Sequence, residues 1–285
     1  MCDISVPALI SSTIVLSMPN KPKLGQNFLH DQQAVQRIAA ALGDCSQETV
    51  IEIGPGRGAV TRILAERAAH VLAIELDQTL ISDLRAEFPP DRVTITHQDV
   101  LQFDFAATSA QAGHRLPVIG NLPYYITSPI LLKLAANHSV LDRAVLMMQR
   151  EVADRVAAEP GSRDYGLLSV TAQLYGPVEK LFTLPPGAFS PPPQVHSTVI
   201  RWRFNPRFAS LGVSETEFLN FARKAFAQKR KTLANNLRAA ELASEAIAHA
   251  FASANINPQA RAEAVSIESL ATLWRSLAAA TNPNM

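Results

Sequence analysis

The chain has 285 residues, of which 47% are hydrophobic and 18% are charged. It is therefore too apolar for a disordered protein and long enough for one large core with a smaller second unit. Its two cysteines, Cys2 and Cys45, and its seven histidines show no paired spacing. We expect neither a disulfide framework nor a metal site, and a reducing cytoplasm as the location.

The first 20 residues are set apart from the rest by their composition. The segment "VPALISSTIVLSM" is apolar enough to suggest a secretory leader, but no Lys or Arg precedes it and Pro7 and several serines interrupt it. We therefore expect residues 1–20 to be a dispensable extension, with no membrane span. Met18 is a possible alternative start of translation.

Short runs of Val, Ile and Leu alternate with segments of helical pattern, which is typical of β-α-β units. This predicts a doubly wound, Rossmann-like α/β domain over residues 21–205, closed by a hairpin. The expected strands cover 50–53, 71–74, 93–96, 118–119 and 144–148, with the hairpin at 178–184 and 195–203. The expected helices cover 31–41, 59–67, 78–87, 129–136, 150–157 and 165–174.

From residue 206 the composition becomes rich in Ala and poor in Gly. Phe218, Phe221, Ala225 and Phe226 recur at the spacing of one helical face. We predict a small all-helical domain over residues 206–285.

Positive charge is concentrated at the start of this second unit. Residues 201–238 hold nine basic and two acidic side chains, a net +7, which leaves −6 for the rest because the whole chain carries +1. Such asymmetry favours one surface for a polyanion, although a solvated helix surface explains the charge equally well.

The segment "VIEIGPGRGAVT" is an expected strand that runs into a glycine loop and a helix. Glycines there let the backbone turn sharply and approach a ligand. Gly54, Gly56 and Ala59 fit the dinucleotide pattern, and Glu75 follows at the distance of a ribose-binding acid. S-adenosylmethionine enzymes place the same groups in the same order, so both cofactor classes remain open at this point.

Two later features favour chemistry on adenine. Asp99 follows the third expected strand, where it could accept a hydrogen bond from an adenine amino group or cap a helix. In "IGNLPYYITSP", the side chain of Asn121 and a main-chain carbonyl near Pro123 could accept both hydrogens of an exocyclic amino group. The nitrogen lone pair would then be localised for attack, and Tyr124 offers a face on which the base can stack.

Taken together, these motifs resemble the S-adenosylmethionine-dependent adenine N6,N6-dimethyltransferases of small-subunit ribosomal RNA. The resemblance covers roughly residues 20 to 280 and is far more specific than any one motif. The matching segments are "KLGQNFLHD", "IEIGPGRGAVT", Glu75, "QDVLQFD", "GNLPYYITSPI", "MMQREVADRV", "YGLLSV", "FSPPPQVHSTV" and "KRKTLANNL".

The resemblance implies a cofactor, a reaction and a set of residues. The cofactor is S-adenosylmethionine, and the reaction adds two methyl groups to each of two adjacent adenosines near the 3′ end of 16S rRNA. The implied cofactor-binding residues are Asn27, Leu29, Gly54, Glu75, Asp99 and Asn121, with Gly56 from the same glycine loop.

Four residues are implied to act on the target base, namely Asn121, Pro123, Tyr124 and Phe189. The resemblance implies that Phe189 lies over the base opposite Tyr124, since a base must leave its stack to be methylated. The alternative is that Phe189 anchors its proline-rich loop on the core.

The basic segment then becomes the expected RNA surface of the helical domain. The expected partner is 16S rRNA in a partly assembled small subunit, and the protein is expected to act as a monomer. The candidate phosphate contacts are Arg223, Lys224, Lys229, Arg230, Lys231 and Arg238.

Three other readings stay open from the sequence. The enzyme could methylate adenine in DNA or a glutamine side chain in a protein. The chain could serve mainly as a ribosome-assembly or nucleic-acid-binding factor. It could also be a nicotinamide dehydrogenase, although "NLPYY" has no role in such an enzyme.

Overall fold

The computed structural model describes residues 26–281. The expectations for residues 1–20, and the opening of the motif "KLGQNFLHD" at 23–25, lie outside this range. Within it, no helix is long and apolar enough to span a membrane.

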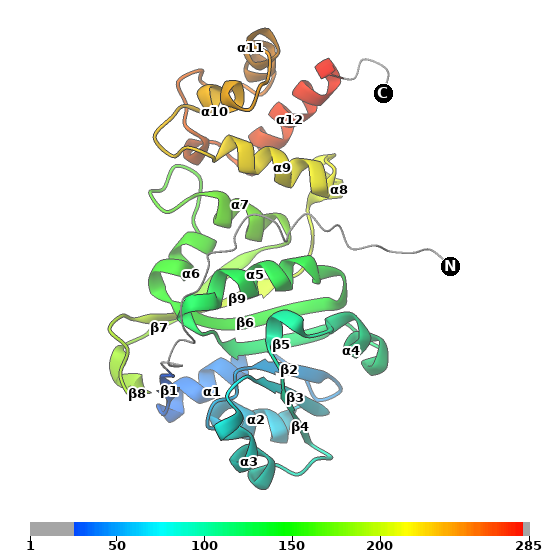
Figure 1. Ribbon diagram of the computed structural model, residues 1–285, viewed down its shortest axis with the longest axis vertical. Helices are drawn as coiled ribbons and strands as arrows, with labels where there is room; N and C mark the ends of the chain where they lie inside the picture. The colour runs from blue at the N-terminus through cyan, green and yellow to red at the C-terminus, as the bar shows by residue number, and fades with distance from the viewer. Residues whose placement is uncertain (1–25, 282–285) are drawn as a thin grey trace.

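A seven-stranded sheet forms the centre of the molecule, in the order β4-β3-β2-β5-β6-β9-β7 (Figure 1). Strands β2 to β6 are parallel to one another, while β9 is antiparallel to both β6 and β7. The predicted parallel sheet and its closing hairpin are therefore confirmed. The strands are β2 (Thr49–Ile53), β3 (His70–Glu75), β4 (Val93–His97), β5 (Leu116–Asn121), β6 (Leu141–Gln149), β7 (Val178–Leu184) and β9 (Ser197–Arg203).

Successive residues of the strands face two apolar layers, as the pleat requires. On β2, Val50 packs into the cluster formed with the first three helices, and Ile51 packs into the cluster formed with the next four. The sheet is thus covered by helices on both faces. These helices are α1 (Gln32–Ala41), α2 (Ala59–Arg67), α3 (Gln78–Glu87), α4 (Phe105–Ala112), α5 (Thr127–Ala136), α6 (Arg150–Val156) and α7 (Leu167–Leu174).

The bounds of α2 and α3 agree with the predictions, whereas α5 begins two residues earlier and α7 two residues later than expected. Helix α4 was not predicted. Its residues are mostly small or polar and only Phe105 is buried, so it lacks an apolar stripe. Asp104 caps it by accepting a hydrogen bond from the Ala107 amide.

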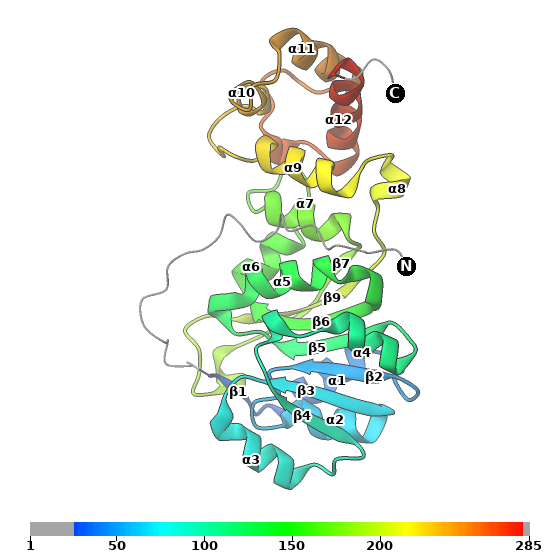
Figure 2. The same ribbon diagram turned by 45° about the vertical axis from the view of Figure 1, so that its right-hand side comes forward.

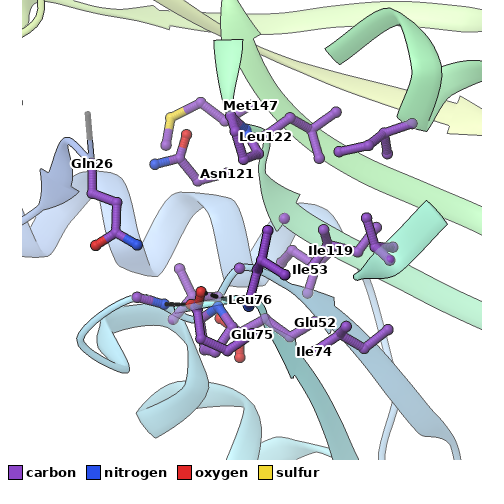
Figure 3. A pocket seen from close by; sticks show the side chains of 18 of the residues that line it. Gln26, Glu52, Ile53, Ile74, Glu75, Leu76, Ile119, Asn121, Leu122 and Met147 are labelled. Carbon is purple, nitrogen blue, oxygen red and sulfur yellow. Dashed lines mark hydrogen bonds between the residues drawn. The ribbon is translucent and has the colours of Figure 1, made fainter. Parts of the chain in front are cut away.

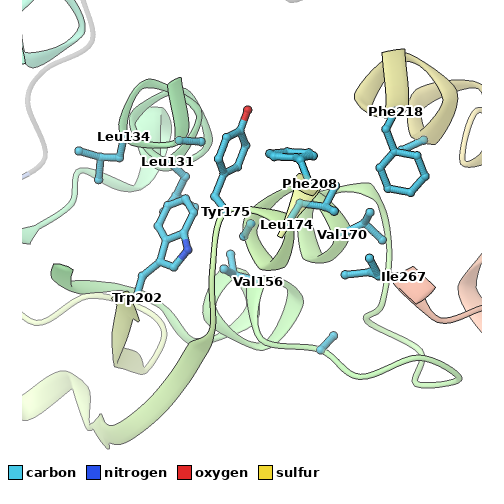
Figure 4. Packing of buried hydrophobic residues seen from close by; sticks show 14 of the residues in the cluster. Leu131, Leu134, Val156, Val170, Leu174, Tyr175, Trp202, Phe208, Phe218 and Ile267 are labelled. Atoms are coloured by element: carbon cyan, nitrogen blue, oxygen red, sulfur yellow. The ribbon is translucent and has the colours of Figure 1, made fainter. Parts of the chain in front are cut away.

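The C-terminal part is helical, as predicted, and stacks beyond α7 at one end of the sheet layer (Figure 2). Phe218, Phe221 and Ala225 are buried, as the helical spacing indicated, and Phe226 is half-buried. Phe218 and Ile267 belong to the same apolar cluster as Val170 of α7 (Figure 4). One core therefore runs from the sheet into α8 (Phe208–Leu211), α9 (Glu215–Ala225), α10 (Leu233–Ala239), α11 (Ser244–Ser253) and α12 (Ile267–Thr281).

A separate two-stranded pair joins distant parts of the chain. Strand β1 (Phe28–Leu29) is antiparallel to β8 (Phe189–Ser190), with Leu29 opposite Phe189. The amide of His30 also donates a hydrogen bond to the carbonyl of Ala188. This pairing fixes the segment that precedes α1, which borders the pocket described below.

Candidate active site

A pocket opens at the carboxyl ends of the parallel strands, between β2 and β5 (Figure 3). The chain proceeds from β2 to β3 and β4 at one edge and then returns to pair β5 with β2. Such a reversal leaves a crevice where open α/β sheets bind their ligands. The predicted residues that line this pocket are Asn27, Leu29, Gly54, Gly56, Glu75, Asp99, Asn121, Pro123 and Tyr124.

The glycine loop is held to the end of β3 by Glu75. Its carboxylate accepts hydrogen bonds from the amide of Gly56, at 3.2 Å, and from the amides of Leu76 and Asp77, both at 2.9 Å. Gly54 and Gly56 have φ of 69° and 58°, which disfavours side chains at both positions. Burial raises the pKa of Glu75, while these amides lower it. The loop backbone is therefore fixed next to a carboxylate that borders the pocket.

Asp99 combines the two roles that the sequence left open. Its Oδ1 accepts a hydrogen bond from the Leu101 amide at 2.9 Å, which caps a short 3₁₀ helix (Val100–Gln102). Asp99 also lines the pocket, and its Oδ2 has no hydrogen bond within residues 26–281. A capping role and a ligand role are thus compatible.

Asn121 ends β5 and lies across the pocket from Glu75 (Figure 3). Its Nδ2 donates a hydrogen bond to the main-chain carbonyl of Asn27 at 3.3 Å. Because the amide nitrogen is used in this way, the Oδ1 atom is the end of the group that can accept a hydrogen bond from a ligand.

The structure also separates the two main-chain carbonyls that the sequence left as alternatives. The Pro123 carbonyl accepts hydrogen bonds from the Ile126 amide and from the Thr127 hydroxyl, at 3.2 and 3.0 Å. The Leu122 carbonyl has no such partner in the described part of the chain, while its amide is fixed by the Met147 carbonyl at 2.9 Å. Leu122 is therefore the better second acceptor.

The two tyrosines of "NLPYY" differ in their surroundings. Tyr124 is half-buried, and its hydroxyl forms a hydrogen bond with Ser197 Oγ at 2.9 Å, which fixes the ring at the pocket wall. Tyr125 also lines the pocket but is 43% exposed. Burial raises the pKa of Tyr125, and the charges of Asp99 and Glu75 raise it further. Tyr125 was not predicted from the sequence as a site residue, although its position beside Tyr124 was the available signal.

Phe189 is not brought to the pocket. It is 2% exposed, packs in the cluster of α1 to α3 and is absent from the pocket wall. Its surroundings are those of the alternative role, an anchor of its loop on the core. A place over the target base stays a prediction and requires the loop to move.

Glu52 is a further pocket residue that no sequence motif predicted. It is 3% exposed, borders the pocket from β2, and its Oε2 has no hydrogen-bond partner within residues 26–281. Burial raises its pKa to about 7, and the charge of Glu75 contributes to this shift. The signal in the sequence was a carboxylate inside the apolar run "VIEIG".

The acidic and basic side chains around the pocket are Glu52, Glu75, Asp99 and Arg57. The guanidinium of Arg57 lies over the Phe28 ring at 4.4 Å, at the rim. Acidic groups therefore outnumber basic ones, which favours a cationic ligand over one that carries a pyrophosphate. Among residues 26–281 there is no cluster of His, Cys, Asp or Glu that could hold a metal ion.

A family model for ribosomal RNA adenine dimethylase matches residues 18–279. The chain belongs to this family. A ribosomal RNA small subunit methyltransferase A from Acidobacterium capsulatum is 57% identical over 92% of this chain and 93% of its own length. Another such methyltransferase, from Koribacter versatilis, is 49% identical over 90% of this chain and 94% of its own length.

Solved structures support the fold of this rRNA adenine dimethylase family member. The 23S rRNA methyltransferase ErmE superposes with a TM-score of 0.70 at 24% identity, covering 88% of this chain and all of its own. A dimethyladenosine transferase from Plasmodium falciparum gives a TM-score of 0.70 at 23% identity, covering 86% of this chain and 95% of its own. At these identities the likeness establishes the α/β methyltransferase fold alone.

The six predicted RNA-binding residues of this family member are all exposed. Arg223 and Lys224 lie in the last turn of α9, Lys229 to Lys231 follow that helix, and Arg238 lies in the last turn of α10. None of the six forms an ion pair with another described residue, whereas Arg201 and Arg207 of the same basic segment are paired with Glu179 and Glu268. The available positive charge is thus concentrated near α9 and α10, while the RNA role of these residues remains a prediction.

Proposed function

We propose that this rRNA adenine dimethylase uses S-adenosylmethionine to methylate N6 of two adjacent adenosines near the 3′ end of 16S rRNA. The observation that carries this proposal is the single pocket that joins Glu75 and Asp99 to the amide of Asn121. The carboxylates that would bind an adenosine lie on one side of the pocket, and the acceptors that would bind an amino group lie on the opposite side.

The residues present fit the cofactor. Glu75 would accept from the ribose hydroxyls, as acids at the end of a second strand do, and Asp99 Oδ2 would accept from the adenine amino group. Gly54 and Gly56 let the backbone approach, and Asn27 and Leu29 close the pocket from the segment around β1. The excess of acidic groups suits a sulfonium, which supplies an electrophilic methyl group when the cofactor is bound.

The target amino group would be held by Asn121 Oδ1 and the Leu122 carbonyl. Two acceptors aimed at the N6 hydrogens favour a pyramidal nitrogen, whose lone pair is then localised for in-line attack. The nitrogen would form a bond to the methyl carbon as the sulfur–carbon bond of the sulfonium breaks and leaves a neutral thioether. The methylated nitrogen would then release one proton to water, so no strong base is needed. Pro123 sets the turn that follows these two acceptors.

Tyr124 would support the base from one side, since its ring is fixed at the pocket wall by Ser197. If Phe189 covers the opposite face, its loop must leave the core on substrate binding. Each target must also be turned out of its stack, because a stacked adenine cannot reach a pocket at the end of a sheet.

The RNA would lie along the exposed cations of α9 and α10, which contribute affinity more than sequence specificity. We infer a division into a methyltransferase domain at 21–205 and a helical RNA-binding domain at 206–285, acting as a cytoplasmic monomer on a partly assembled subunit. The continuous core between the two parts supports a fixed orientation between pocket and RNA surface.

Nucleoside mass spectrometry tests this function directly. Purified protein and S-adenosylmethionine are incubated with small subunits that lack the modification, with naked rRNA and adenine-containing DNA in parallel. We expect N6,N6-dimethyladenosine in the subunit sample. Methylation of DNA or of protein alone would contradict the proposed substrate, and cofactor binding without any transfer would favour an assembly factor.

A further inference from the structure

A second cleft, of about 570 Å³, lies where the C-terminal helices meet the sheet layer. Its walls come from α6, from the segment between α6 and α7 with the start of α7, from the residues after α9, from α10 and from residues 262–263. It shares no lining residue with the pocket at the sheet's carboxyl edge. Its volume lies within the range of about 300–1,000 Å³ that is usual for sites of small organic ligands.

Two residues that line this cleft, Tyr165 and Asn236, each hold a buried side-chain oxygen, Tyr165 Oη and Asn236 Oδ1, with no hydrogen-bond partner within residues 26–281. The Tyr165 and Asn236 residues are only 2% and 3% exposed. Asn236 Nδ2 donates to the carbonyls of Ala225 and Gln228, at 2.7 and 3.2 Å, so Oδ1 is the free end of the amide. Native proteins pair nearly all buried polar atoms, so two exceptions on one cleft indicate a ligand.

The rest of the cleft suits a flat ring with an attached anion. The rings of Tyr165 and Phe226 meet edge to face at 6.1 Å, and half-buried Phe226 borders the cleft. Lys229 Nζ donates to the main-chain carbonyl of Arg163 at 3.2 Å, which brings two exposed cationic residues together. Three carboxylates also line the cleft: Glu151 and Glu263 are paired with Arg155 and Arg261, and Asp164 has no ion pair in the described chain.

We propose that this cleft holds one unpaired nucleotide of the RNA substrate, distinct from the target adenosines. The base would lie against Phe226, with its edge toward Tyr165 and Asn236, and its phosphate would lie near Arg163 and Lys229. Because Asn236 Oδ1 and Asp164 are acceptors, a base with an exocyclic amino group fits better than uracil. This inference rests on the proposed function, in which the substrate is RNA, and it gives that RNA a second contact with the protein besides the methylation pocket.

Kinetics with unmodified small subunits test the attachment. Tyr165→Phe removes one hydroxyl and keeps the ring, and Arg163→Gln removes one charge. Each change should raise the KM for subunits roughly fivefold, the size of one net hydrogen bond, with kcat and the KM for S-adenosylmethionine unchanged. The proposal would be overturned if the wild-type enzyme methylates subunits and both variants have the same KM for subunits as the wild type.

Tyr175→Phe is the matched control. Tyr175 is equally buried, at 2% exposed, but its hydroxyl donates to Glu215 at 2.8 Å and it does not line the cleft. The same chemical change there should lower thermal stability and leave the KM for subunits unchanged.

Chemical probing of the bound subunits identifies the occupant. One A, C or G of the rRNA outside the target pair should be protected by wild-type protein and become reactive with Tyr165→Phe. If the KM rises but no base outside the target pair changes its reactivity, the proposed nucleotide is excluded. The footprint requires binding and not methyl transfer, so a failure of the proposed reaction is distinguished from a failure of this site.

Discussion

Asn121 Nδ2 donates a hydrogen bond to the main-chain carbonyl of Asn27, 94 positions earlier in the chain, at 3.3 Å. This contact ties the end of β5 to the segment before α1, which β8 holds in place by pairing with β1. It also fixes which end of the Asn121 amide can meet a ligand. The orientation of the proposed catalytic acceptor therefore depends on a pairing between strands of two residues each.

The first prediction concerns this acceptor. Asn121→Ala should reduce methyl transfer to background, because one of the two acceptors for N6 is lost. Binding of S-adenosylmethionine should be weakened and still measurable, since Glu75 and Asp99 remain. Transfer of radiolabelled methyl groups and calorimetric titration of the cofactor check the two parts separately. Undiminished transfer would refute the proposed role of the amide.

The second prediction separates the two functions of the Asn121 side chain. Asn121→Asp keeps acceptor oxygens and removes the donor to Asn27. We expect transfer to be impaired and not abolished, with a larger loss at the chemical step than in cofactor binding. Single-turnover rates of the two variants, measured side by side, test this order. An aspartate variant as inactive as the alanine variant would show that the donor is as necessary as the acceptor.

The third prediction concerns stability and pH. The pKa of Glu52 rises from its ordinary value of 4.5 to about 7 in the folded protein, so folding binds a proton between these values. Its contribution to stability is fully present below pH 4.5 and is lost as the pH rises through 7, a change of roughly 3 kcal/mol at most. Glu52→Gln should therefore be more stable than wild type at pH 8 and similar near pH 5.

Urea unfolding of both proteins at a series of pH values measures this difference. Glu66→Gln on the exposed surface of α2 reports the effect of removing a surface carboxylate. If the difference between wild type and Glu52→Gln is constant from pH 5 to 8, Glu52 is not the group that binds the proton.

The sequence predicted the sheet well because its central strands, β2, β5 and β6, are mostly buried on both faces and contain apolar runs. It failed where structure depends on pairing between distant segments or on caps. The pairing of Leu29 with Phe189 has no local signal, and α4 forms from a segment of small and polar residues with one buried side chain, Phe105, and a cap at Asp104. These features appear only once the chain is folded.

For the candidate site, the motifs identified the residues that meet at the pocket but not the state of each group. Glu52 was overlooked because a carboxylate inside an apolar strand carries no motif of its own. The Leu122 and Pro123 carbonyls could not be separated either, because main-chain hydrogen bonds follow from the turn geometry.

The fourth prediction assigns a role to Tyr125. Its exposed ring lies near Asp99 and Glu75, the groups proposed to hold the adenosine of the cofactor, so we expect it to cover that part of the ligand. Tyr125→Ala should raise the KM for S-adenosylmethionine about tenfold, and Tyr125→Phe should preserve it, because stacking uses the ring. Steady-state kinetics with each substrate varied in turn checks this. A rise confined to the KM for RNA would place Tyr125 on the RNA side.

The last prediction concerns the RNA surface. Replacing Lys229, Arg230 and Lys231 by Ala should weaken RNA binding and reduce the slope of log affinity against log salt by about 2 to 3, since each phosphate contact releases close to one counterion. Replacing Arg62, Arg67 and Arg85 by Gln is the matched control, because α2 and α3 lie at the end of the molecule opposite α9 and α10 (Figure 1). Filter binding at a series of salt concentrations measures both slopes. Counterion release reports only the cations that contact phosphate. If the Lys229, Arg230 and Lys231 variant keeps its slope while the Arg62, Arg67 and Arg85 variant loses slope, the RNA binds near α2 and α3 and not near α9 and α10.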